Sequence, residues 1–139
     1  MAKMIRVADI MTPNPITVQP TTKLDEVIGL MKTHHFRHLL VVDNQQVIGI
    51  ISDRDVRLVM NSPLVQLQPK KGWKLLNTVR ADGCMTPNPL TIGPNATAGK
   101  AAELMNHYKF DALPVIKEGR LVGIVTVSDI LKSYSELTT

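Results

Sequence analysis

The chain has 139 residues, and 44% of them are apolar, which suits one compact domain or two halves that fold together and excludes a disordered chain. The 16 Lys and Arg residues exceed the 12 Asp and Glu residues, and this net charge of +4 favours an anionic partner. No apolar run approaches the ~20 residues needed to cross a bilayer. Residues 1–6 lack the apolar stretch of a signal peptide, and the single cysteine excludes an internal disulfide, so we expect a cytoplasmic protein without a membrane partner.

A Pro-rich pentad, Met-Thr-Pro-Asn-Pro, occurs at residues 11–15 and again, unchanged, 74 positions later at residues 85–89. The same offset aligns Leu30-Met31 with Leu104-Met105, Gly49-Ile50 with Gly123-Ile124, and Asp55 with Asp129. A repeat of this length indicates a tandem duplication. We therefore divide the chain into repeat 1 (residues 9–60), a linker (61–82) and repeat 2 (83–134).

The first elements of repeat 1 are a turn, a strand and a helix. The two prolines of the pentad predict a turn, since proline fixes its own φ and disfavours helix in the residue before it. Residues 16–18 form a short β-prone piece. Apolar residues at helical spacing, from Leu24 to Met31, then predict an amphipathic helix, with Thr22 as its N-cap and Asp25 three residues on.

Two strands and a second helix complete repeat 1. Residues 39–43 and 47–52 are nearly continuous apolar runs, which indicates strands buried on both faces. A helix begins near Asp53. Repeat 2 has the same order, with a short strand at 90–92, a helix from Ala98, strands at 113–116 and 121–126, and a helix near Ser128. Each copy is thus a βαββα unit with too few strands to fold alone.

The linker matches neither repeat. It carries a basic cluster, Lys70-Lys71-Gly72-Trp73-Lys74, and predicts one short helix around residues 74–79. The fold class is α/β (α+β), in which two βαββα repeats pack with pseudo-two-fold symmetry around a shared core. We expect a cleft along that axis.

The strand-to-helix corner of each repeat is the main candidate site. Ser52 precedes Asp55 by three residues, and Thr126 precedes Asp129 by three, at the start of a helix. This spacing is that of a capping box, which needs no ligand. The same geometry also suits a nucleotide, because free N–H groups at a helix N-terminus attract phosphate and a carboxylate suits the hydroxyls of a ribose. Both uses can coexist.

These motifs together resemble the CBS (cystathionine-β-synthase-type) domain. The resemblance rests on the Met-Thr-Pro-x-Pro pentad, the run at residues 36–43 and the Gly-Ile-Ile-Ser-Asp-Arg-Asp stretch at 49–55, each with a counterpart in repeat 2. It covers nearly the whole chain except the linker. Pairs of such domains, called Bateman modules, are regulatory. The resemblance implies a non-catalytic, stand-alone sensor that binds AMP, ADP, ATP, S-adenosylmethionine or NAD and has no obligatory cofactor.

The resemblance also implies roles for individual residues. Asp55 and Asp129 would hold the ribose, with the hydroxyls of Ser52 and Thr126 beside the ribose and phosphate. The adenine pocket would be lined by the first short strand of each repeat, and phosphates would be reached by the basic pair before the second strand. These last residues are Ile16, Thr17, Leu90 and Thr91 for the adenine, and Arg37 and His38 for the phosphates.

The two repeats differ where phosphate charge is expected. Arg37-His38 is replaced by Asp111-Ala112 in repeat 2, and Arg54 by Ser128. We therefore expect one strong nucleotide site in repeat 1 and a weak or altered site in repeat 2. Solvated surface charge is the other explanation for the two arginines.

Other functions are compatible with parts of the sequence. The basic Trp73 cluster could bind nucleic acid, or the chain could be a dimerisation scaffold without ligand. His34 and His38 have i,i+4 spacing, but the strand that begins near residue 39 argues that they do not share a helix, so we expect no metal site. Nothing resembles a nucleophile–base pair, so we expect no catalytic residues. A stand-alone sensor must signal to another chain, and the family resemblance implies a homodimer.

Overall fold

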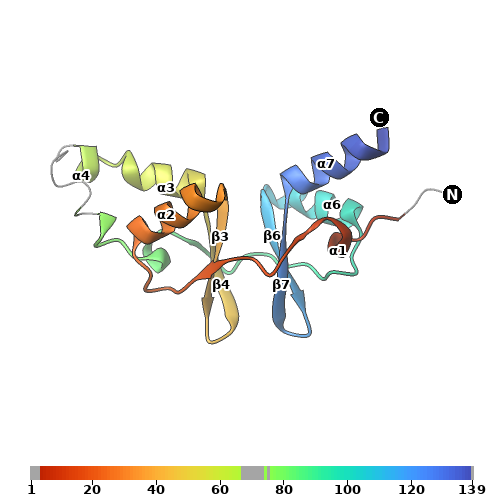
Figure 1. Ribbon diagram of the computed structural model, residues 1–139, viewed down its shortest axis with the longest axis horizontal. Coiled ribbons are helices and arrows are strands. Elements are labelled where there is room, and N and C mark those ends of the chain that lie inside the picture. Colours follow the sequence, from red (N-terminus) through yellow and green to blue (C-terminus); the bar gives the residue numbers. More distant parts are fainter. Residues whose placement is uncertain (1–3, 67–73, 75, 139) are drawn as a thin grey trace. The chain divides into compact units, whose positions relative to one another are not determined.

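The computed structural model describes residues 4–66, 74 and 76–138 (Figure 1). It divides into two compact units, which we call unit 1 (Met1–Pro15 and Leu90–Thr139) and unit 2 (Ile16–Pro89). Each unit is an α/β assembly in which helices cover a small sheet, as the repeat pattern predicted. The units do not coincide with the repeats, because each unit contains the pentad of the other repeat.

Unit 2 holds most of repeat 1. Its sheet has the strand order β2-β3-β4-β5, with β2 parallel to β3 and the remaining pairs antiparallel. The helices α2, α3 and α4 and the 3-10 helix η1 accompany this sheet. The bounds are β2 (Thr17–Val18), α2 (Leu24–His34), β3 (His38–Asp43), β4 (Gln46–Ser52), α3 (Asp53–Met60), α4 (Pro63–Gln66), η1 (Ala81–Gly83) and β5 (Thr86–Pro87).

Unit 1 repeats this plan with the residues of repeat 2. Its sheet has the order β1-β7-β6, and Ile92 adds a parallel bridge to Val115 at the position that β2 takes in unit 2. The bounds are α1 (Val7–Ile10), β1 (Thr12–Pro13), α6 (Ala98–Tyr108), β6 (Ala112–Lys117), β7 (Arg120–Thr126) and α7 (Val127–Thr138).

The pentads are the main difference from the sequence-based prediction. We expected turns inside each repeat, but Thr12–Pro13 pairs with β7 and Thr86–Pro87 pairs with β4 as two-residue edge strands. Edge strands tolerate proline because the missing N–H is not needed for the ladder. The bend comes one residue later, where Asn14 and Asn88 have φ values of 46° and 51°. Each pentad thus completes the sheet of the other repeat, and we call this arrangement the exchange of pentads.

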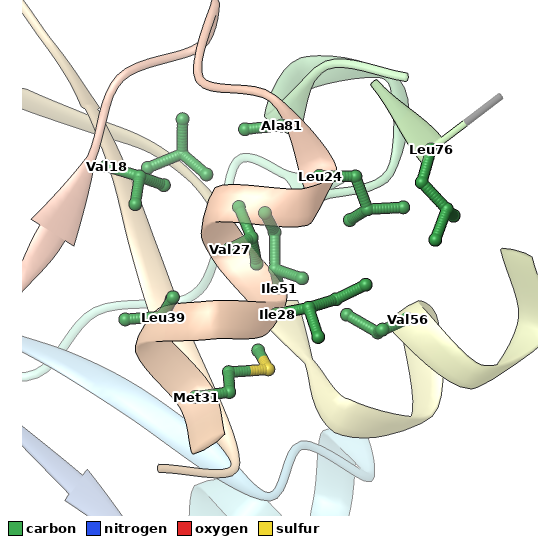
Figure 2. Close-up of a cluster of buried hydrophobic side chains, with 11 residues drawn as sticks. Val18, Leu24, Val27, Ile28, Met31, Leu39, Ile51, Val56, Leu76 and Ala81 are labelled. Atoms are coloured by element: carbon green, nitrogen blue, oxygen red, sulfur yellow. The ribbon is translucent and has the colours of Figure 1, made fainter. Parts of the chain in front are cut away.

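The core of unit 2 lies between α2 and one face of the sheet. Figure 2 shows side chains of α2 gathered with Leu39 and Ile51 of the sheet and Val56 of α3. Because strand side chains alternate, Leu40 lies on the opposite face from Leu39, and both are 1% exposed. The β3 strand is therefore buried on both faces, as its continuous apolar run predicted.

The start of α2 corrects one local prediction. The N-cap is Lys23 and not Thr22, and it makes no side-chain capping bond. The Thr22 Oγ1 instead accepts from the Gln19 N–H at 3.0 Å, and the Leu24 N–H donates to the Val79 carbonyl at 2.9 Å. A carbonyl distant in sequence, that of Val79, thus accepts from an N–H group at the start of the helix, where a local side-chain cap was expected. In unit 1 the residue equivalent to Lys23 is Thr97, and its side chain does cap α6.

Candidate functional site

The first corner joins the end of β4 to the start of α3. The Ser52 N–H donates to the Asp55 Oδ2 at 2.8 Å, and the Asp55 N–H donates to the Ser52 Oγ at 3.1 Å. The Asp53 N–H donates to the Arg37 carbonyl at 2.8 Å, which fixes the chain before β3 against the helix start. The capping box expected from the spacing is therefore present, and both of its side chains are half-buried.

The second corner, between β7 and α7, has nearly the same geometry. The Thr126 N–H donates to the Asp129 Oδ2 at 2.9 Å, and the Asp129 N–H donates to the Thr126 Oγ1 at 3.3 Å. The Thr126 hydroxyl also donates to the Asp129 Oδ2 at 3.1 Å. An ionised carboxylate has about four acceptor positions, so the cap leaves capacity for further donors. Capping and ligand binding are compatible at both corners.

The sheet register places further candidate residues of repeat 1 beside its corner. His38 lies opposite Ser52 on β4, and Thr17 lies opposite Leu40, two residues further along β3. Because side chains alternate along a strand, Thr17, His38 and Ser52 share one face, opposite the face that packs against α2. The structure therefore brings three predicted site residues to one face within unit 2.

The remaining candidates of repeat 1 lie in different surroundings. Arg37 and Arg54 are exposed, and no ion pair among the described residues involves either guanidinium. Ile16 is half-buried and packs against the core of unit 2. Ile16 is thus in part a core residue, whereas the two arginines are accessible to an anion.

The candidates of repeat 2 follow the same pattern without the charges. Ala112 lies opposite Thr126, where repeat 1 has His38 opposite Ser52. Thr91 and Ser128 are exposed, and Leu90 packs against the core of unit 1. The candidate residues of this corner supply hydroxyl and carboxylate groups, and none of them is a cation.

Cys84 is a neighbour of the first corner that the sequence did not place there. It directly precedes the second pentad and packs against the core of unit 2. Burial, and then the negative charge of Asp55, raise the pKa of its thiol from 9.0 to about 11. A thiol held in its neutral form is a poor nucleophile. The exchange of pentads explains its position, since residue 84 belongs to repeat 2 but lies in unit 2.

The described part of the chain contains no cluster of metal-ligating side chains and no helix that could span a membrane. No group of three or more His, Cys, Asp and Glu side chains in residues 4–66, 74 and 76–138 could hold a metal ion. α2 ends at His34, and His38 begins β3, so the two histidines do not share a helix, as expected. Within the same residues, no helix is both long and apolar enough to span a bilayer. Trp73 and most of its basic cluster lie outside the described residues. Of the short helix expected around residues 74–79, residues 74 and 76 are helical and residues 77 and 78 form a turn.

Comparison with known families agrees with this architecture. The sequence profile described as "CBS domain" matches residues 7–67 and 79–136. The chain belongs to the CBS domain family. A CBS domain-containing protein of Dictyostelium discoideum is 34% identical over 129 residues, which are 91% of this chain and 89% of that protein.

Some relatives are much longer proteins. The inosine-5'-monophosphate dehydrogenase of Korarchaeum cryptofilum is 32% identical over 94% of this chain, but the match spans only 25% of that enzyme. Because the match spans a quarter of the enzyme, the similarity applies to that part of the enzyme alone.

Solved structures of CBS pairs have the same fold. CBSX2 from Arabidopsis thaliana has a TM-score of 0.80 at 27% identity and covers 97% of both chains. A structure of CBSX2 in complex with AMP has a TM-score of 0.76 at 28% identity, covering 97% of this chain and 99% of that one. The CBS domain pair of protein MJ0100, in complex with 5'-methylthioadenosine and S-adenosyl-L-methionine, has a TM-score of 0.79 at 25% identity, covering 98% of this chain and all of that one.

Proposed function

We propose that this CBS pair is a non-catalytic regulatory module that binds an adenosyl ligand, such as AMP, ADP, ATP, S-adenosylmethionine or NAD, at its strand-to-helix corners. The observation that supports this most directly is the pair of matching corners, each with a half-buried Asp carboxylate and a hydroxyl at a helix start. Such a helix start offers N–H groups to a phosphate, and the carboxylate accepts from ribose hydroxyls. The complexes of CBSX2 with AMP and of MJ0100 with two adenosyl compounds support the ligand class.

Individual residues take the roles that the corner chemistry allows. Asp55 accepts from the ribose hydroxyls while its Oδ2 continues to cap α3. Ser52 and His38 lie on the same sheet face, beside the ribose and phosphate, and Thr17 lies further along that face toward the adenine. In repeat 2, Asp129, Thr126 and Thr91 take the equivalent places.

We propose that the two corners bind with unequal affinity. A nucleotide phosphate at the first corner would lie near the exposed cations Arg37 and Arg54. The second corner has Asp111 and Ser128 at these positions, and Asp111 would repel an anion. A neutral or cationic adenosyl compound would be repelled less there, so the second corner discriminates against phosphates.

A thermal-shift panel of AMP, ADP, ATP, S-adenosylmethionine and NAD tests the ligand class. A ligand present at 100 times its Kd stabilises the folded state by about 2.7 kcal/mol, which is a clear upward shift in Tm. The absence of a shift with all five compounds would contradict the proposal.

Three variants test the assignment of the corners. For a phosphate-containing ligand, Asp55→Ala should weaken binding more than Asp129→Ala, because repeat 1 carries the cations. Asp55→Asn keeps an oxygen that can accept from the Ser52 N–H, so it separates loss of charge from loss of the cap. The reverse order of the two alanine variants would refute the asymmetry.

The module also needs a means of signalling. We propose that it acts as a homodimer whose ligand-bound and ligand-free states differ in their affinity for a protein partner. Nucleic-acid binding through the Trp73 cluster remains an alternative, and its affinity would fall steeply with added salt.

A further inference from the structure

A hollow with a volume of about 330 Å³ lies between α6 and α7 in unit 1 (Figure 1). Most of the residues that line it are apolar, and they are Ala102, Met105, Phe110, Val127, Ile130 and Leu131. The others are Asn106, Lys109 and Asp111. A concave, mostly apolar surface with a few polar groups is typical of a small-molecule site.

Repeat 2 has a small residue at this hollow where repeat 1 has a large one. Ala102 corresponds to Ile28 at the offset of 74, and Ile130 corresponds to Val56. In unit 2 the Ile28 side chain is 7% exposed and lies beside Val56 (Figure 2). The isoleucine thus fills in unit 2 space that the alanine leaves open in unit 1.

The wall that α7 contributes is also apolar in repeat 2 alone. Val127 and Leu131 stand where repeat 1 has Asp53 and Arg57, which approach each other at 3.7 Å in unit 2. Leu131 is 63% exposed, so it offers apolar surface to a ligand in the hollow. Burying the charged pair of repeat 1 under an apolar ligand would cost free energy that this leucine does not lose. The hollow is therefore a feature of repeat 2.

Two charged side chains of opposite sign lie at the margin of the hollow, one on each side of Phe110 in the sequence. Lys109 is the C-cap of α6, and its N–H donates to the Met105 carbonyl. The Asp111 carbonyl accepts from the Val127 N–H of α7 at 2.9 Å. The backbone that carries both charges is thus held to both helices. Neither side chain forms an ion pair with another residue of the described ranges, so both are available to a ligand.

We propose that this hollow binds an apolar α-amino acid. The ammonium group of the ligand donates to the Asp111 carboxylate, the ligand carboxylate accepts from the Lys109 ammonium, and the apolar side chain enters the hollow. A zwitterion satisfies both margin charges, whereas an apolar acid or amine satisfies one. The volume is near the lower limit of ~300 Å³ for small-molecule pockets, which suits leucine, methionine or phenylalanine. The site is separate from the adenosyl ligand of the proposed function.

Isothermal titration of the full chain with L-leucine, L-methionine and L-phenylalanine tests the ligand class. At least one of the three should bind saturably. The amine and the acid that each lack one charge, such as 2-phenylethylamine and 3-phenylpropanoate for phenylalanine, should bind about fivefold more weakly, which is the effect of one exposed ion pair. Binding of none of the three amino acids, or an analogue that binds as tightly as its amino acid, would overturn the proposal.

Charge-neutralising variants test which side chains hold the zwitterion. Asp111→Asn and Lys109→Gln should each raise the Kd of the amino acid about fivefold. Glu118→Gln and Lys117→Gln are the matched controls, because they make equivalent changes at exposed positions of the hairpin between β6 and β7, away from the lining of the hollow. These controls should leave the Kd unchanged. A Kd that changes equally in both sets, or in neither, would contradict the proposed contacts.

Filling the hollow tests its location. Ala102→Ile introduces the residue of repeat 1 and should raise the Kd of the amino acid at least about tenfold, because it occupies the space of the ligand side chain. Ala102→Val adds less volume and should act in the same direction, and it decides the test where circular dichroism shows that the isoleucine variant does not fold. Full affinity in a folded variant would refute this location.

The same samples distinguish this proposal from the proposed function. The Ala102→Val chain should keep the thermal shift that an adenosyl ligand gives the unsubstituted chain. An unsubstituted chain that shows the adenosyl shift but binds no amino acid would refute only the site between α6 and α7. A chain that binds an amino acid but none of the five adenosyl compounds would refute only the adenosyl ligand class.

Discussion

The exchanged pentads make Gly49 the most informative single position in the sheet of unit 2. A Cβ placed there would collide with the Met85 Sδ and lie 2.8 Å from the Met85 Cγ and 3.1 Å from its Cβ. The Sδ could move away, but the Met85 Cβ is held by the backbone, because Met85 directly precedes β5 and β5 pairs with β4 at Gly49 itself. Overpacking of this kind costs about 1–3 kcal/mol, so Gly49→Ala should lower the free energy of unfolding by that amount.

Urea denaturation followed by circular dichroism measures this effect, and α2 provides the matched control. Gly29 lies on α2 with nothing within 4 Å of an added Cβ. The same change there, Gly29→Ala, should raise the free energy of unfolding by about 0.5–1 kcal/mol, because glycine is a poor helix residue. In addition, Gly49→Ala combined with Met85→Ala should cost less than the sum of the two single changes. A neutral or stabilising Gly49→Ala would refute the contact and, with it, the placement of the second pentad.

Two further predictions concern a helix cap and the thiol beside the first corner. Thr97→Ala should lower the free energy of unfolding by about 1 kcal/mol, because the Lys100 N–H loses the Thr97 Oγ1 as its acceptor. Thr97→Ser keeps a hydroxyl and should restore the stability. Equal stability of the two variants would exclude the cap. Alkylation of Cys84 in the folded protein should rise with pH toward an inflection near 11, and Asp55→Asn should lower that inflection. The folded thiol binds its proton more tightly than the unfolded thiol. Its contribution to stability is therefore complete below pH 9 and is lost as the pH rises to about 11. An alkylation rate that inflects near pH 9 in the folded protein would contradict the burial of Cys84.

The strands, the long helices and the corners could be predicted because their determinants are local. Continuous apolar runs predicted β3 and β4, and the corner spacing predicted the Ser52–Asp55 capping box. The duplication added confirmation, because each pattern occurs twice at one offset. These elements needed no knowledge of what packs against them.

The pairing of the pentads could not be predicted in the same way. An identical pentad in both repeats pairs equally well with either β4 or β7 by sequence, so the pattern does not say which partner it takes. Long-range contacts also overrode the local signal at Thr22, where Val79 supplies the acceptor for the helix start. Cys84 was missed beside Asp55 for the same reason, because its position follows from the exchange of pentads.

Isothermal titration of the chain with AMP and the other four adenosyl compounds tests the central claim most directly. The proposed function predicts saturable binding of at least one compound. For a ligand that carries phosphate, it predicts one stronger site, which Asp55→Asn weakens more than Asp129→Asn does. Heats that do not saturate for any of the five, or binding unchanged when both aspartates are replaced together, would contradict the claim that these corners bind adenosyl ligands.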